Sequence, residues 1–224
     1  MKKLKFISII TIIIIFISVI ITSLAFKKET NENKYVILVS IDDSKLYVFK
    51  DKILYKSYPI SPGKPSTPTP VGTYKIISKA KWGEGFGGRW MGLNVGYGKY
   101  GIHGTYYEQF IGAHVSKGCI RMMNDHVKEL YSYIPIGTLV VIFEGSFGPF
   151  RNGFRTIYPG DTGEDVMEVQ KALKKLGFYY GEPEGKYGKA TEYALYQFLK
   201  KNNLRITNKI TPYIMSKLGI TLFE

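Results

Sequence analysis

The chain has 224 residues, of which 45% are hydrophobic and 15% aromatic, and this composition excludes an intrinsically disordered protein. A single cysteine, Cys119, excludes an intramolecular disulfide framework and leaves a free thiol or an intermolecular bridge. The net charge of +13 favours anionic partners, but the sequence has no dense arginine or lysine tract of the kind that binds nucleic acid. A solvated basic surface without a particular partner explains the charge equally well.

Residues 6–25 (FISIITIIIIFISVIITSLA) form an apolar run that is long enough to cross a bilayer as a helix. Lysines precede the run, which favours a cytoplasmic N-terminus. A cleaved signal peptide usually has a shorter apolar core, although residues 23–25 (SLA) resemble a cleavage site. We therefore expect a signal anchor at residues 1–26. Residues 27–224 should lie outside the cell whether or not the segment is cleaved.

Short β-branched and aromatic runs, separated by turn residues, follow a polar spacer. Such runs at this spacing are typical of a β-meander or a β-sandwich. The segment 35–144 is therefore expected to be an α+β domain, a mixed and mostly β sandwich with one short helix. The expected strands are residues 35–40, 46–49, 53–60, 73–78 and 138–143.

Two segments of this domain are rich in proline or glycine. Residues 61–72 contain four prolines, which cannot donate hydrogen bonds to a strand ladder, and an irregular loop is predicted. Residues 81–101 contain eight glycines and several aromatic residues. This composition suits either a mobile flap over a binding groove or hairpin turns with packed aromatic side chains.

The end of the first domain and the start of the second are marked by helix signals. Asn124 or Asp125 can cap a short helix at residues 126–133. Residues 145–157 are interpreted as a linker, and a second domain is expected at residues 158–221.

The second domain has the pattern of three short helices. Apolar residues three and four positions apart predict a helix that begins with a capping box of Thr162 and Asp165 and ends at Gly177. A second helix is expected at residues 189–201, and Pro212 suits the first position of a third. The bundle has no strong catalytic constellation, so we expect it to bind rather than to catalyse.

Cys119 needs a base or a nearby positive charge to act as a nucleophile, because a free thiol is mostly protonated at neutral pH. His103 is the best candidate base, since it lies at a strand end between glycines (GIHGT). His114 could line the same cleft, and His126 is expected to be a solvated residue of the first helical turn. The alternative for a lone cysteine is a small, buried apolar residue.

The neighbours of Cys119 suggest a site for an oxyanion. Gly118 permits a sharp turn, so the amides of Lys117, Gly118 and Cys119 could point at one spot. Lys117 and Arg121 add positive potential. Arg121 is too close to Cys119 for a phosphatase loop, and CxxC, HExxH and GxSxG patterns are absent from the sequence.

Three sequence blocks resemble the L,D-transpeptidase catalytic domain of YkuD type. They are TPVGTYKI at residues 69–76, YGIHGT at residues 100–105 and SKGCIRMMNDH at residues 116–126. The family pattern has a histidine about sixteen residues before a cysteine, as His103 and Cys119 are here. The resemblance therefore implies that Cys119 is the nucleophile and His103 the base.

The resemblance also implies which residues surround the substrate and the oxyanion. Many family members have histidine at the position of Lys117, and lysine occurs there in a subgroup. This departure puts a second histidine close to the cysteine in doubt, unless His114 fills that space. The implied substrate and oxyanion residues are Ser116, Lys117, Gly118, Arg121 and Gly104.

Residues 158–221 resemble a three-helix peptidoglycan-binding module, which implies cell-wall glycan as its partner. Each matching piece is weak alone, but the pieces support one another and the first domain. The matching residues are Gly160, Gly163, Val166, Gln170, Leu173, Gly177, Gly181, Gly185, Gly188, Thr191, Ala194 and Phe198.

Together the resemblances imply an enzyme that forms 3→3 cross-links between peptidoglycan peptide stems. The thiol would displace the fourth-position D-alanine from the third-position diamino acid, and an amine from a neighbouring stem would resolve the thioester. Neither a metal nor an organic cofactor is implied, and nucleic acid is not an expected partner. The alternatives are an L,D-carboxypeptidase and a non-catalytic scaffold that binds the wall. A sortase-like transpeptidase fits poorly, because its histidine lies much farther from its cysteine.

Overall fold

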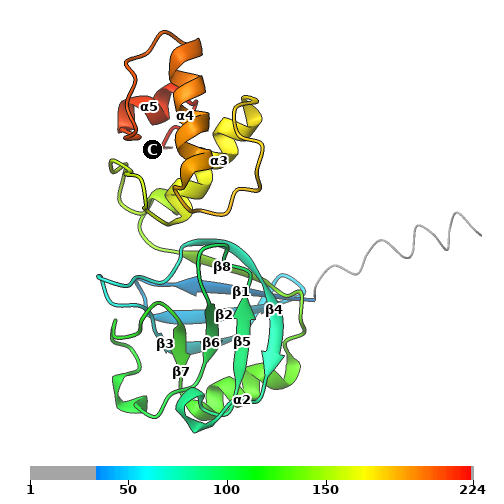
Figure 1. Ribbon diagram of the computed structural model, residues 1–224. Helices are drawn as coiled ribbons and strands as arrows, with labels where there is room; N and C mark the ends of the chain where they lie inside the picture. Colours follow the sequence, from blue (N-terminus) through cyan, green and yellow to red (C-terminus); the bar gives the residue numbers. More distant parts are fainter. Residues whose placement is uncertain (1–33, 223–224) are drawn as a thin grey trace, which may run out of the picture. The chain divides into compact units, whose positions relative to one another are not determined.

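The computed structural model describes residues 34–222, and from Tyr35 onward the described chain forms one compact unit. A β domain with one α-helix comes first in the chain and a helical domain follows (Figure 1). No helix among the described residues is long and apolar enough to cross a membrane. The signal anchor predicted at residues 1–26 lies outside the described residues.

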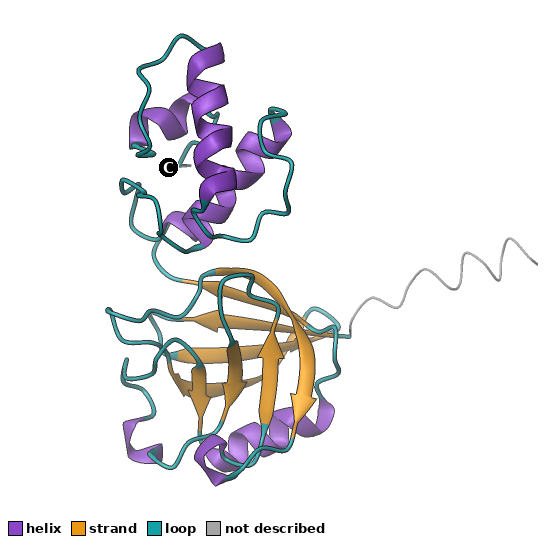
Figure 2. Ribbon diagram, in the orientation of Figure 1, coloured by secondary structure: helices purple, strands orange, loops and turns teal. Residues whose placement is uncertain are grey.

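The five predicted strands are all present, and the β domain contains three more. The strand end predicted at His103 is confirmed by β6, but the sequence pattern does not give the bounds of β5, β6 and β7, because they are short and two of them contain glycine. Figure 2 shows the strands in orange. Their bounds are β1 Tyr35–Ser40, β2 Lys45–Lys50, β3 Ile53–Ser61, β4 Gly72–Ala80, β5 Trp90–Leu93, β6 Tyr100–His103, β7 Ile120–Met122 and β8 Leu139–Phe143.

The strands close into a barrel in the order β1-β2-β3-β7-β6-β5-β4-β8, so the predicted sandwich is wrong. Closure depends on β8, which pairs in parallel with β1 and antiparallel with β4. A second parallel pair joins β6 and β7. Alternation along a strand is the same in a sandwich and in a barrel, and it does not show whether the edge strands meet.

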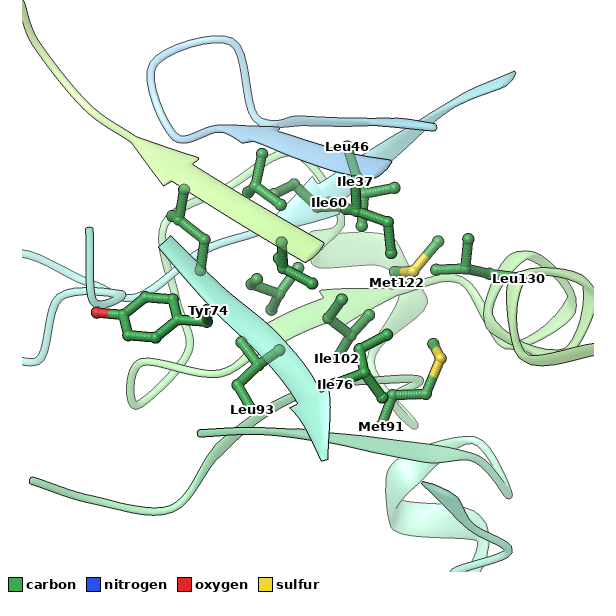
Figure 3. Packing of buried hydrophobic residues seen from close by; sticks show 14 of the residues in the cluster. Ile37, Leu46, Ile60, Tyr74, Ile76, Met91, Leu93, Ile102, Met122 and Leu130 are labelled. Carbon is green, nitrogen blue, oxygen red and sulfur yellow. The ribbon is translucent and has the colours of Figure 1, made fainter. Parts of the chain in front are cut away.

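The barrel interior is filled by branched and sulfur-containing side chains from every strand (Figure 3). Each strand turns alternate residues inward, as the period of two requires. Leu130 of helix α2 (Asn124–Tyr133) lies beside Met122 at one end of this core (Figure 3). Full burial of such a side chain contributes about 1.5–3 kcal/mol, so the core holds β6 and β7 in a fixed register.

The glycine-rich segment 81–101 forms packed structure rather than an open flap. It contains a short 3₁₀ turn, η1 (Glu84–Phe86), and then β5 and β6, which pair antiparallel. The rings of Trp82 and Trp90 stack with their centroids 4.5 Å apart. Hairpin structure with packed aromatic side chains therefore describes this segment.

Helix α2 (Asn124–Tyr133) buries Val127 and Leu130, as the apolar spacing predicts. The predicted side-chain cap is wrong. Met123 occupies the N-cap position and no side chain caps the helix. The side-chain oxygen of Asn124 instead accepts a hydrogen bond from the Thr105 amide at 2.9 Å.

The C-terminal domain has the three predicted helices around its own buried core. The Thr211 hydroxyl caps α5 by accepting a hydrogen bond from the Ile214 amide at 3.3 Å. The predicted capping box of α3 is wrong, because Gly163 is the N-cap and the Asp165 carboxylate pairs with Arg155 at 2.7 Å. The helix bounds are α3 Glu164–Lys175, α4 Lys189–Lys201 and α5 Pro212–Lys217.

Gln170 of α3 is fully buried and is bonded at both ends of its amide. Its Nε2 donates to the Lys186 carbonyl and to the Thr191 hydroxyl, each at 2.9 Å. Its Oε1 accepts from the amides of Glu184 and Gly185 at 2.9 and 2.8 Å. The side chain thus ties the loop before α4 to α3 and leaves none of its own polar atoms unpaired.

Candidate active site

Strands β6 and β7 bring the predicted nucleophile and base together. In this parallel pair Ile102 lies opposite Ile120, and His103 lies opposite Arg121. Both isoleucines point into the barrel core. Because successive side chains alternate between faces, His103, Cys119 and Arg121 belong to the other face of the pair.

The residues of this face open into a hollow of about 270 Å³. Aromatic side chains form much of its wall, and the polar groups are few, as is common in ligand sites. Cys119 and His103 both line it, so the structure brings together the two residues on which the sequence prediction rests. The lining residues are Gly85, Phe86, His103, Thr105, Tyr106, Tyr107, Lys117, Cys119 and Arg121.

His103 is held between aromatic rings and is only 5% exposed. Its ring stacks on Trp90 with the centroids 5.7 Å apart, and Phe86 meets it edge-on at 4.9 Å. Its Nδ1 lies 2.5 Å from the Gly104 carbonyl oxygen. A carbonyl can only accept, so Nδ1 carries the proton and Nε2 is left free to accept one.

Burial, opposed by the hydrogen bond to the Gly104 carbonyl and assisted by the Arg121 cation, lowers the pKa of His103 to about 4. The imidazole is therefore neutral at physiological pH. A neutral imidazole with a free Nε2 can take the proton of a nearby thiol.

Burial also raises the pKa of the Cys119 thiol, although the Gly101 backbone and Arg121 partly oppose this rise. Cys119 is half-buried rather than hidden, so the sulfur is accessible from the hollow. The free protein thus holds a neutral thiol and a neutral imidazole in the lining of one hollow. The two groups are therefore not a thiolate and imidazolium ion pair. The thiol proton must pass to His103 as the sulfur attacks.

The turn before Cys119 is shaped by Ser116, which is fully buried. The Ser116 hydroxyl donates to the Cys119 carbonyl at 2.6 Å and accepts from the Gly118 amide at 3.0 Å. The Gly118 amide is therefore already used, and the amides of Lys117 and Cys119 remain as candidate oxyanion donors. The sequence could not show that Ser116 engages one of the three amides.

Gly118 is required at its position for two reasons. Its φ is +107°, a conformation that residues with a side chain rarely adopt. A Cβ atom there would also lie 2.7 Å from the Tyr100 ring. The turn of the nucleophile therefore depends on the absence of a side chain at Gly118.

Gly104 positions the base rather than offering a donor to the substrate. Its amide donates to the Phe86 carbonyl at 2.9 Å. A Cβ at Gly104 would lie 2.3 Å from the Asn124 side-chain oxygen. Asn124, which the sequence suggests only as a helix cap, is thus a supporting residue of the site. The backbone amide of Asn124 is in turn bonded by the Glu108 carboxylate.

The other two histidines lie away from the hollow. The Nε2 of His114 is 3.4 Å from the Ser44 hydroxyl on an exposed part of the surface. His126 packs against the Tyr58 ring with the centroids 5.3 Å apart. His114 therefore does not fill the space near the cysteine, and Lys117 stands there with an exposed side chain.

The described residues contain no group of three or more His, Cys, Asp or Glu placed to hold a metal ion.

Residues 34–142 match the family described as "L,D-transpeptidase catalytic domain". The chain is 37% identical over 122 residues to the "Putative L,D-transpeptidase YqjB" of Bacillus subtilis, which covers 47% of this chain and 69% of that protein. The chain belongs to the L,D-transpeptidase family. Residues 162–218 match the family described as "Putative peptidoglycan binding domain".

Other relatives match the same part of the chain. The "Putative L,D-transpeptidase YkuD" of Bacillus subtilis is 45% identical over 109 residues, which are 48% of this chain and 65% of that protein. The chain thus spans slightly less than two thirds of that relative. The solved catalytic domain of the L,D-transpeptidase of E. faecium is 25% identical, with a TM-score of 0.44, over 50% of this chain and 99% of that one.

Proposed function

We propose that this L,D-transpeptidase forms 3→3 cross-links in peptidoglycan through a thioester on Cys119. The observation that carries the proposal is the register of β6 and β7, which puts His103 and Cys119 on one face and in one hollow. A reactive cysteine needs a base within reach, and among the described histidines only His103 lines that hollow.

In the first step the Cys119 sulfur attacks the carbonyl carbon between the third-position diamino acid and the fourth-position D-alanine. The Nε2 of His103 takes the thiol proton and then gives it to the departing amine as the C–N bond breaks. D-alanine leaves and a thioester remains. The amides of Lys117 and Cys119 and the Arg121 cation favour the charge that develops on the carbonyl oxygen.

In the second step an amine from another stem attacks the thioester. A new amide bond forms, the C–S bond breaks, and His103 moves the proton of the amine to the leaving sulfur. Water in place of the amine would make the same site an L,D-carboxypeptidase. The hollow at Cys119 suits either an amine or water as the acceptor. Identification of the reaction product distinguishes the two activities.

The C-terminal module would hold the catalyst on its insoluble substrate. A weak tether raises the effective concentration of the enzyme without adding a contact at Cys119. We also propose that residues 1–26 anchor the chain in the cell membrane, with the catalytic part outside the cell or, after cleavage, in the wall. N-terminal sequencing of the mature protein distinguishes the two.

The deciding experiment incubates the full chain with a disaccharide-tetrapeptide and identifies the products by mass spectrometry. A cross-linked dimer that has lost one D-alanine supports transpeptidation, whereas a tripeptide monomer supports carboxypeptidation. Cys119→Ala is the matched control, and more than about 1% residual product on folded protein would contradict the assigned nucleophile. A carbapenem should add one drug mass to the peptide that holds Cys119.

A further inference from the structure

A second hollow, of about 490 Å³, adjoins the turn that carries the nucleophile, since Lys117 is one of its lining residues. Its lining comes from the proline-rich loop, from Tyr97 and Tyr100, and from the segment that leads into α3. Lys117 lines both this hollow and the one that holds Cys119. The two hollows therefore meet at the Lys117 side chain.

The walls of the larger hollow are held by specific bonds. Arg151 donates to the Thr69 carbonyl at 2.7 Å and so fixes the proline-rich loop. The buried Glu164 carboxylate accepts a hydrogen bond from the Tyr97 hydroxyl at 3.2 Å, and the Tyr74 hydroxyl is a second partner. Side chains held in this way keep the hollow open in a defined shape.

Only a thin wall separates this hollow from the nucleophile. Tyr100 and the Pro68 carbonyl are the groups that a Cβ on Gly118 would meet, at 2.7 and 3.2 Å. Both residues also line the larger hollow. A molecule bound there thus lies next to the turn that places the sulfur.

Of the cationic side chains that line the larger hollow, two already form ion pairs with carboxylates and one does not. Arg151 pairs with Glu144, and Arg155 pairs with Asp161 and Asp165. Lys117 makes no ion pair with any described residue, and its side chain is exposed. It is the lining cation that is available to a carboxylate of a ligand.

We propose that the larger hollow is the subsite for the acceptor strand, and that Lys117 pairs with a carboxylate of that strand. The inference rests on the proposed function, in which two stems must reach one sulfur in turn. The smaller hollow contains the base that protonates the leaving D-alanine, so it suits the donor. A peptide stem with a free amine and free carboxylates matches the remaining cation.

In this arrangement the acceptor lies in the larger hollow, and its amine nitrogen reaches the thioester carbon past Lys117, the residue that lines both hollows. The C–N bond forms, the C–S bond breaks, and the proton of the amine passes through His103 to the sulfur. No oxidant or further reactant is needed. The helical module, through Glu164 and its neighbours, would then contribute part of the acceptor subsite besides binding the wall.

The first test uses Ser66→Trp, which puts a large ring at an exposed position of the larger hollow. Ser57→Trp, at an exposed position that lines neither hollow, is the matched control. Ser66→Trp should raise the acceptor KM about tenfold or more and leave the rate of carbapenem acylation of Cys119 within about twofold of wild type. Ser57→Trp should change neither.

The second test compares acceptors that differ in one charge. Wild type should prefer an acceptor stem with free carboxylates over the same stem amidated, by about tenfold in kcat/KM. Lys117→Ala should remove this preference, Lys117→Arg should keep it, and Lys64→Ala, at an exposed lysine that lines neither hollow, should not alter it.

Three results would overturn the acceptor subsite: equal losses of acylation and cross-linking in Ser66→Trp, no effect of that change on the acceptor KM, or an unchanged preference in Lys117→Ala. A wild-type protein that neither reacts with a carbapenem nor releases D-alanine would instead show that the proposed function has failed.

Discussion

The side-chain oxygen of Asn124 accepts a hydrogen bond from the backbone amide of Thr105 at 2.9 Å. This bond joins the first residue of α2 to the segment that directly follows the base. The same oxygen would be 2.3 Å from a Cβ on Gly104, whose carbonyl holds His103. Asn124 therefore fixes the backbone on which the orientation of the imidazole depends.

Asn124→Ala should lower kcat about tenfold or more with a smaller change in KM. The reason is that His103 loses its position, whereas the contacts of the protein with the substrate remain. Asn124→Asp retains an acceptor oxygen and should recover part of the activity. Asp125→Ala is the control, since the neighbouring side chain is 94% exposed. A loss of kcat that Asn124→Asp does not relieve, or one that Asp125→Ala shares, would contradict this role.

Acid should destabilise the protein through His103. Its pKa is about 4 in the folded state and about 6.5 in the unfolded chain, so between these values the unfolded chain binds more protons. The stabilising contribution is present above about pH 6.5 and is lost as the pH falls towards 4. Between pH 7 and pH 4.5 the loss should be on the order of 2–3 kcal/mol in the free energy of unfolding.

Denaturant titrations of wild type and His103→Gln at both pH values measure this contribution. Carboxylates also titrate in the range, so the comparison between the two proteins isolates the histidine. The variant should lose less stability on acidification than wild type. Equal losses would show that the imidazole is not held in its neutral form by burial.

The Cys119 thiol should react slowly with iodoacetamide at neutral pH, because burial raises its pKa and the thiolate is the reactive form. The alkylation rate should rise with pH, with a midpoint above that of a free cysteine. Arg121→Ala should move the midpoint higher still, since Arg121 favours the thiolate. The adduct is unambiguous because the chain has no other cysteine. A midpoint below neutral pH would indicate a thiolate and imidazolium pair instead.

Gln170→Leu should destabilise the C-terminal bundle by about 2–4 kcal/mol, because it leaves the backbone amides of Glu184 and Gly185 without their acceptor. Lys175→Ala, at an exposed position of the same helix, should have a small effect. Denaturant unfolding followed by the helical circular dichroism signal measures both, because the two tryptophans of the chain lie in the β domain. A loss below about 0.5 kcal/mol for Gln170→Leu would mean that the loop before α4 does not depend on this side chain.

The sequence predicts the parts of the site that depend on local patterns. The spacing of His103 and Cys119, the turn at Gly118 and the helices of the second domain all follow from residue types and their order. Barrel closure does not, because it depends on pairing between β1 and β8, which are about a hundred residues apart. The strand β5 and the start of β6 are likewise not evident, because their glycines disfavour a strand and only the pairing of the two strands in the folded chain overrides this preference.

Hydrogen-bond partners predicted from the sequence are wrong where a side chain has two possible partners. Asn124 has the right type and place for a helix cap, yet its oxygen bonds Thr105 from a different element. Asp165 suits a capping box, yet Arg155 takes its carboxylate. Ser116 likewise takes the Gly118 amide. In each case the nearest competing partner is known only once the chain is folded.

The parallel pairing of β6 and β7 has a consequence for how this enzyme could diversify. Parallel neighbours must be joined by a long connection, and here residues 104–119 run between them. Ladder bonds set the register, so a longer or shorter connection would leave His103 and Arg121 opposite each other. This connection carries Tyr106 and Tyr107, which line the hollow that holds Cys119. Evolution or a designer can therefore exchange the part of this connection before Ser116, which faces the substrate, while the turn with Cys119 and the strand with His103 stay in place.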